Sequence, residues 1–130
     1  MSTGATTIDP ETIAKGIATI RVLLGIAEAL WPRALMRMAT PGQEPANQAV
    51  AALRMAGGRG LALGVGGLLA AKRGPHALRG WAEGGMLADA LDAGSLATAR
   101  WLRPALRWPC VASAVAASIL GGVTARRLTR

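Results

Sequence analysis

The chain has 130 residues, enough for one domain and too few for two of ordinary size, and it carries a formal net charge of +8. Hydrophobic residues make up 52% of it, which excludes an intrinsically disordered chain. The single cysteine excludes a disulfide scaffold, and with the single histidine it excludes a zinc cluster. We therefore expect one domain over residues 1–130 with no bound metal and no cofactor.

Prolines divide the chain into four long windows that favour helices. Proline removes a backbone N–H and clashes with the preceding helical turn, so a long helix fits only between prolines. The windows predict helices over about 11–31, 46–72, 77–102 and 109–126. No stretch alternates apolar and polar residues with β-branched enrichment, so the predicted fold class is all-α.

The first predicted helix is apolar but carries charged residues in its interior. A central arginine such as Arg21 costs about 2.5 to 3.5 kcal/mol in a membrane span, whereas each large aliphatic residue gains only about 0.3 to 0.6 kcal/mol. Alone, this helix inserts poorly into a bilayer. If it spans a membrane, it needs partner helices there.

The second and third predicted helices combine glycine pairs with further charges. Gly60-x-x-x-Gly64 and Gly80-x-x-x-Gly84 have the spacing that lets helix backbones approach closely, although a Gly-rich chain also produces such pairs by chance. In the third helix Asp89 and Asp92 are three residues apart and share a face. Two such carboxylates repel unless one is protonated or a cation lies between them.

The fourth predicted helix is the best candidate for a membrane span. Residues 109–125 contain no charge, and two arginines follow at once. The four tryptophans, at positions 31, 81, 101 and 108, fall near window ends, where indole prefers the headgroup boundary. These features predict a four-helix transmembrane bundle with up-down topology. The competing class is a soluble helical oligomer that buries its Ala-rich faces.

Basic residues give the orientation of such a bundle. With the N-terminus inside, seven basic residues lie inside and five outside, so both termini are predicted to be cytoplasmic. The first apolar run lacks a basic lead-in and is broken by Arg21, so we expect no cleavable signal. The predicted location is a bacterial inner membrane.

The intrahelical charges converge when the helices are aligned by depth. If the first three spans centre near residues 21, 60 and 90, then Arg21, Arg59, Asp89 and Asp92 meet near the midplane. A guanidinium there can hold two carboxylates at once. Toward the outer side, Glu28 and Arg54 are matched in depth and form a predicted secondary ion pair, although Arg54 is rotated by about 140° from Arg59.

This polar centre has three interpretations. It can be a purely structural ion-pair network, a binding site, or an acid-base catalytic site acting on an apolar substrate. Because an intramembrane charge points to function by default, we predict binding of a lipid-like small molecule or of a membrane partner, and keep a small membrane enzyme as the alternative. Expected partners are membrane lipids, a membrane protein or a second copy. The basic residues are scattered without aromatic stacking partners, so no nucleic acid is expected.

Three short motifs resemble a known family. Arg21-Val-Leu-Leu-Gly25 followed by Trp31-Pro32, then Gly57-Gly-Arg59-Gly-Leu-Ala-Leu-Gly64, then Asp89-Ala-Leu-Asp92, are similar to segments of small four-helix membrane proteins common in actinobacteria. The likeness covers the first three helices and omits the fourth. It implies a four-helix membrane fold and brings no activity with it.

Overall fold

A computed structural model describes residues 9–100 and 102–128. Within them the chain forms five α-helices and no strand, which confirms the predicted all-α fold class. The helices are α1 (Pro10–Leu30), α2 (Pro32–Ala39), α3 (Asn47–Arg73), α4 (Pro75–Thr98) and α5 (Pro104–Arg127).

The helix boundaries differ from the sequence prediction in three places, two of which involve proline. Helix α4 ends at Thr98 instead of near 102. The proline windows do not predict the short helix α2. Pro32 ends the first window, but it occupies the first position of a new helix, where its missing N–H has no partner to lose. Helix α5 begins at Pro104 rather than at 109 and contains Pro109 in its second turn. There the missing N–H removes a single intrahelical hydrogen bond.

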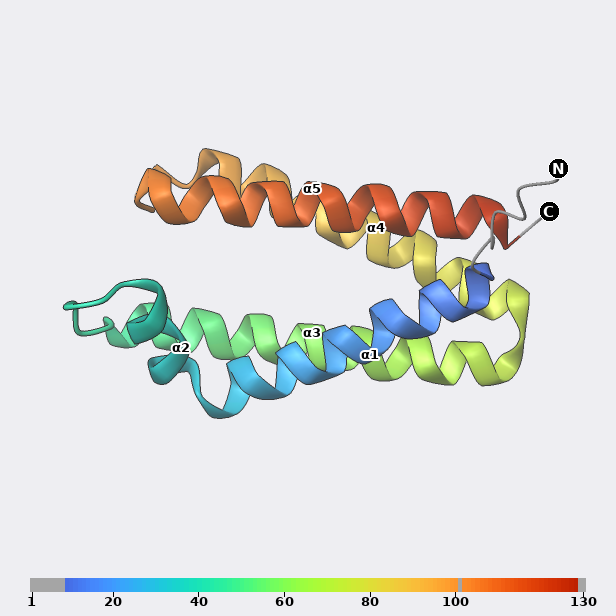
Figure 1. Cartoon of the computed structure of the whole chain (residues 1–130), viewed down its shortest axis with the longest axis horizontal. Coiled ribbons are helices and arrows are strands. Elements are labelled where there is room, and N and C mark those ends of the chain that lie inside the picture. Colours follow the sequence, from blue (N-terminus) through green and yellow to red (C-terminus); the bar gives the residue numbers. More distant parts are fainter. Residues whose placement is uncertain (1–8, 101, 129–130) are drawn as a thin grey trace, which may run out of the picture.

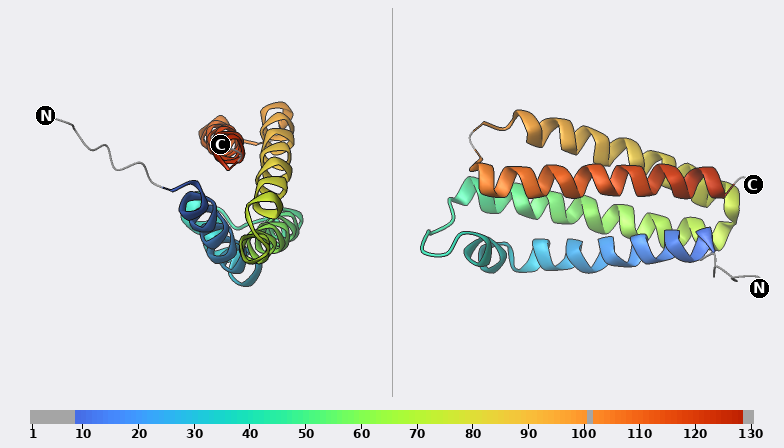
Figure 2. Two further views of the ribbon diagram at one scale, coloured as in Figure 1. Left: turned by 90° about the vertical axis from the view of Figure 1, so that its right-hand side faces the viewer. Right: turned by 45° about the horizontal axis from the view of Figure 1, so that its top comes forward.

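The four long helices form two antiparallel pairs. Helix α1 packs along α3, and α4 packs along α5 (Figures 1 and 2). Gly74, with a φ of 106° that favours glycine, makes the sharp connection from α3 to α4. The pairs meet near this turn, at the end where α1 begins and α5 ends, and they diverge toward the end that carries α2 (Figure 1).

Glycines bring the backbones of α1 and α3 into contact. A Cβ added at Gly25 would lie 2.5 Å from the backbone N of Leu61, and one at Gly64 would lie 2.7 Å from the carbonyl oxygen of Ala18. A larger residue at either position forces the helices apart. In contrast, nothing lies within 4 Å of a Cβ at Gly80 or Gly84, so this second glycine pair makes no helix contact.

Trp81, in the second turn of α4, packs against α3. Its indole Nε1 donates a hydrogen bond to the carbonyl oxygen of Leu63 at 2.7 Å, and its ring covers Gly67 on α3. Trp31 and Trp108, at the opposite end of the molecule, are exposed. Trp101 lies outside the described residues.

The interior is made of small residues, and the large apolar residues face outward. Among residues 9–100 and 102–128, six of the eight buried hydrophobic residues are alanines, and Leu78 is the largest fully buried apolar side chain. In the same part of the chain sixteen large hydrophobic side chains are exposed, among them Leu23, Leu87 and Ile119. Among the described helices, α5 alone is long and apolar enough to cross a membrane by length and composition.

Candidate functional site

The first half of the site is an ion pair between Arg21 and Asp89, which we call the inner pair. Arg21 extends from the middle of α1, and its Nη2 donates to Oδ2 of Asp89 on α4. Asp89 is buried, with 8% of its surface exposed. Gly85 lies one turn earlier on α4, and a Cβ there would contact the same Nη2 at 3.7 Å. The inner pair therefore joins one helix pair to the other through a shielded contact.

The second half is an ion pair between Arg59 on α3 and Asp92 on α4, which we call the outer pair. Nη1 of Arg59 donates to Oδ2 of Asp92, and the two side chains are 42% and 44% exposed. The sequence suggested that one guanidinium could hold both aspartates, but each arginine holds one. The repulsion between Asp89 and Asp92 is thus offset by two separate cations, one from α1 and one from α3.

The structure does not bring Glu28 and Arg54 into an ion pair. Arg54 is exposed on α3, while Glu28 is partly buried on α1, where its Cβ packs close to Gly57. The rotation of about 140° between Arg54 and Arg59 explains the separation, because the cavity side of α3 already carries Arg59. Within the described chain, Glu28 takes part in neither a hydrogen bond nor an ion pair.

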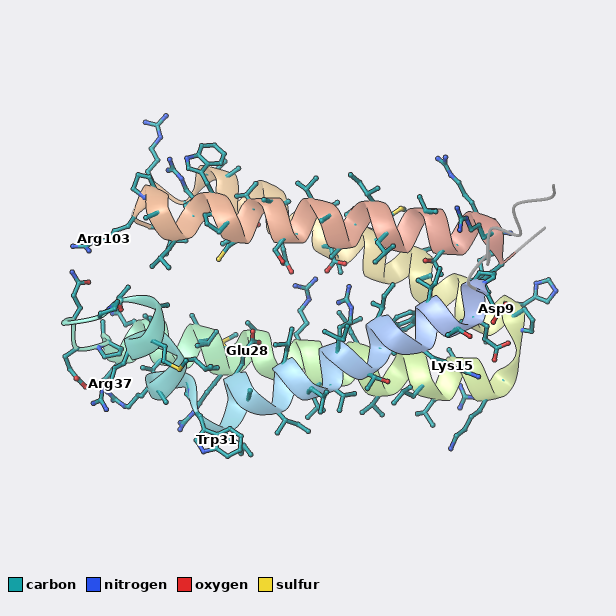
Figure 3. All side chains as sticks on the ribbon, in the orientation of Figure 1. Asp9, Lys15, Glu28, Trp31, Arg37 and Arg103 are labelled. Carbon is teal, nitrogen blue, oxygen red and sulfur yellow. The ribbon has the colours of Figure 1, made fainter. Side chains whose placement is uncertain are left out.

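A cavity of about 940 Å³ opens between the two helix pairs. We call it the groove. All four members of the inner and outer pairs line it, together with Glu28. Helix α5 lines the groove across from α1 and α3, and the two helix pairs diverge toward the end that carries α2 (Figure 3). Its hydroxyl, thiol and apolar lining comes from Ala56, Leu63, Ser95, Leu96, Thr98, Ala99, Pro109, Cys110, Ser113, Ala114 and Ala117.

The contribution of α5 to this site was missed in the sequence. Cys110 and Ser113 are three residues apart and therefore share one face, but that face lies within the charge-free run 109–125, which is typical of ordinary membrane-span surface. Neither residue is close in sequence to a charged group of the polar centre. The only available signal was the pair of polar side chains on an otherwise Ala-rich helix.

Polar contacts gather at the open end of the groove. Arg33 and Arg37, one turn apart on α2, both approach Glu44, at 3.5 and 2.9 Å. The hydrogen bond from Arg37 lowers the pKa of the Glu44 carboxyl, and the charges of both arginines act in the same direction. With its amide oxygen turned toward Arg103, Gln43 accepts from Nη1 at 3.0 Å and from Nη2 at 2.6 Å. Loop 40–46 is therefore tied to the segment that leads into α5.

Among residues 9–100 and 102–128, no three His, Cys, Asp or Glu side chains are grouped as a metal ion requires. No family model, curated protein or solved structure matches this chain. The likeness to four-helix membrane proteins of actinobacteria rests on the short motifs alone and remains a prediction.

Proposed function

We propose that this chain is an integral membrane protein whose four long helices cross the bilayer and whose groove binds a lipid-like small molecule. The observation that carries the proposal is the inverted placement of side chains. Arg21, Arg59, Asp89 and Asp92 face a cavity between the helices, while leucines, isoleucines and valines face outward along all four long helices.

This placement suits lipid better than water. A monomeric soluble protein rarely exposes a large contiguous apolar surface, because each Å² left in water costs about 25 cal/mol. In a bilayer the same surface contacts acyl chains at no such cost. Helix association in lipid then depends on close backbone packing, which the contacts at Gly25 and Gly64 provide.

The charges in the middle of α1, α3 and α4 are compatible with a bilayer because Arg21 and Arg59 are each paired with an aspartate. Helices α1, α3 and α4 fall short of a membrane span when each is judged alone, and α5 does not. A charge that is buried against an opposite charge avoids most of the cost of facing hydrocarbon. We therefore propose that α1, α3 and α4 are stable in the bilayer as an assembly, held by the inner and outer pairs.

The ends of the helices support an orientation with both termini on the cytoplasmic side of an inner membrane. The α3–α4 turn lies at the same end as the start of α1 and the end of α5 (Figure 1). It carries Lys72 and Arg73, with Arg79 one turn further on. Arg126 and Arg127 complete α5 at this end. A basic excess on one side is the feature that sets orientation in small membrane proteins.

Ligand binding accounts for the groove better than catalysis. Its volume lies within the range of about 300 to 1,000 Å³ that small-molecule sites occupy. Each aspartate in it is already bound to a guanidinium, so proton transfer would first require an ion pair to break. A bound molecule makes no such demand.

Two experiments test the proposal. The protein is expressed with an affinity tag, and membranes are washed with alkaline carbonate: retention in the pellet is expected, and recovery in the soluble fraction overturns the membrane assignment. Native mass spectrometry then measures lipid carried by the purified protein. Ala114→Trp fills the groove and removes that lipid, whereas Ala116→Trp, which is exposed on α5 outside the groove, retains it. Equal lipid on both variants would argue against the groove as the site.

A further inference from the structure

We infer that the ligand of the groove is an amphiphile with a protonated amine, and that Glu28 is its counter-charge. This inference rests on the proposed function and names the chemistry of its ligand. It is carried by the charges and hydrogen-bonding groups that the groove leaves without a partner.

The charge balance of the groove leaves one carboxylate over. Arg21 and Arg59 are each neutralised by an aspartate, and Glu28 is the fifth charged residue in the lining. Within the described residues its carboxylate has neither an ion-pair nor a hydrogen-bond partner. Its side chain extends from α1 toward the space below α5 (Figure 3). The groove thus presents a single uncompensated negative charge to a ligand.

Two hydroxyls on the α4 side of the groove are oriented to accept hydrogen bonds from a ligand. The hydroxyl of Ser95 donates to the carbonyl oxygen of Leu91 at 2.8 Å, and the hydroxyl of Thr98 donates to that of Gly94 at 3.2 Å. The hydrogens of these hydroxyls are committed to the helix backbone, which leaves their oxygen lone pairs to accept. A ligand that supplies N–H donors meets this lining without leaving an acceptor unpaired.

An anionic headgroup fits the same lining poorly. If it bound Arg21 or Arg59, it would lie beside Asp89 or Asp92, whose carboxylate already neutralises that guanidinium through a charge-assisted hydrogen bond. It would also be repelled by Glu28. A hydrocarbon tail, in contrast, finds apolar lining from α3, α4 and α5 at Leu63, Leu96 and Ala114. An alkylammonium therefore matches both parts of the groove.

Cys110 provides a direct measure of occupancy. It is the single cysteine of the chain, it is exposed, and it lines the groove. The full chain in phosphatidylcholine nanodiscs is treated with a maleimide, with and without dodecylamine. Occupancy of about nine-tenths slows alkylation of Cys110 about tenfold. The Cys110→Ser variant gives the labelling background.

The charge of the ligand is tested on the unmodified protein. N-dodecylacetamide has the same chain but no cation, and dodecanoate carries the opposite charge. Protection by dodecylamine alone supports the inference. Equal protection by all three compounds overturns the inference and leaves the groove as a general amphiphile site. Protection by none of them overturns the groove as a ligand site, and with it the proposed function.

The role of Glu28 is tested by substitution. Glu28→Gln removes the charge and keeps the size, and we expect the affinity for dodecylamine to fall about tenfold, as for the loss of one charge-assisted contact. Glu83→Gln removes a carboxylate paired with Arg79 on the outer surface, and it leaves protection unchanged. Equal protection in Glu28→Gln and in the unmodified chain would exclude Glu28 as the counter-charge.

Discussion

Arg21 on α1 and Asp89 on α4 form an ion pair that connects the two helix pairs directly. A buried ion pair contributes little net stability, but removal of one partner leaves the other charge buried and uncompensated. Asp89→Asn is therefore expected to lower the free energy of unfolding by about 3 to 5 kcal/mol. Asp92→Asn affects a half-exposed pair and is expected to cost about 1 kcal/mol or less. Titration with SDS in a neutral detergent, monitored by circular dichroism, measures the free energy of unfolding of both variants.

A double substitution tests whether the loss of stability in Asp89→Asn comes from leaving Arg21 as a buried charge without a partner. The double variant Arg21→Met with Asp89→Leu removes both charges and replaces them by apolar groups, and it should recover most of the stability lost in Asp89→Asn. If the double variant were as unstable as Asp89→Asn, the cost of leaving Arg21 without a partner could not explain the loss. The contact between Arg21 and Asp89 would then itself stabilise the fold.

The glycine contacts between α1 and α3 predict position-specific effects of alanine. Gly64→Ala places a Cβ 2.7 Å from the Ala18 carbonyl oxygen and should destabilise the protein by about 1 to 3 kcal/mol, because the helices must separate. Gly58 lies on the same helix with nothing within 4 Å, so Gly58→Ala should be neutral or stabilising by up to about 1 kcal/mol. Thermal unfolding of both variants in one detergent makes the comparison, and equal losses would contradict the described helix interface.

The sequence was sufficient for the fold class and for part of the site. Proline spacing and the absence of alternation predict helices because both act locally, and the shared depth of Arg21, Arg59, Asp89 and Asp92 follows from helix geometry. The partner of each arginine depends on how the helices rotate and tilt, and that is set by glycine contacts far apart in the chain. The rotation of the helices also explains why Glu28 does not pair with Arg54, as the sequence predicts. It likewise places Trp81 against α3, which the sequence alone does not show.

The positions of the tryptophans predict a pattern of quenching by brominated lipid. In single-tryptophan variants, phosphatidylcholine brominated near the headgroup end of the acyl chain should quench Trp31 and Trp108 strongly, because both are exposed at one end of the helices. Trp81 is held between α3 and α4 by its hydrogen bond to Leu63 and should be quenched less. Equal quenching of all three would argue against the proposed placement in the bilayer.

Glu44 predicts a pH dependence in the loop that follows α2. Its folded pKa is lowered, first by the hydrogen bond from Arg37, so the contact is fully present above the ordinary pKa of a glutamate and is lost as the pH falls through the lowered value. An NMR titration of the Glu44 side-chain carboxyl measures this pKa in the unmodified chain and in Arg37→Gln, where it should rise toward that of a free glutamate. The control is Arg54→Gln, which removes an exposed charge on α3, away from the Arg37–Glu44 contact. It should leave the pKa of Glu44 unchanged. If Arg37→Gln and Arg54→Gln gave the same titration curve, the lowered pKa would have a cause other than the α2 contact.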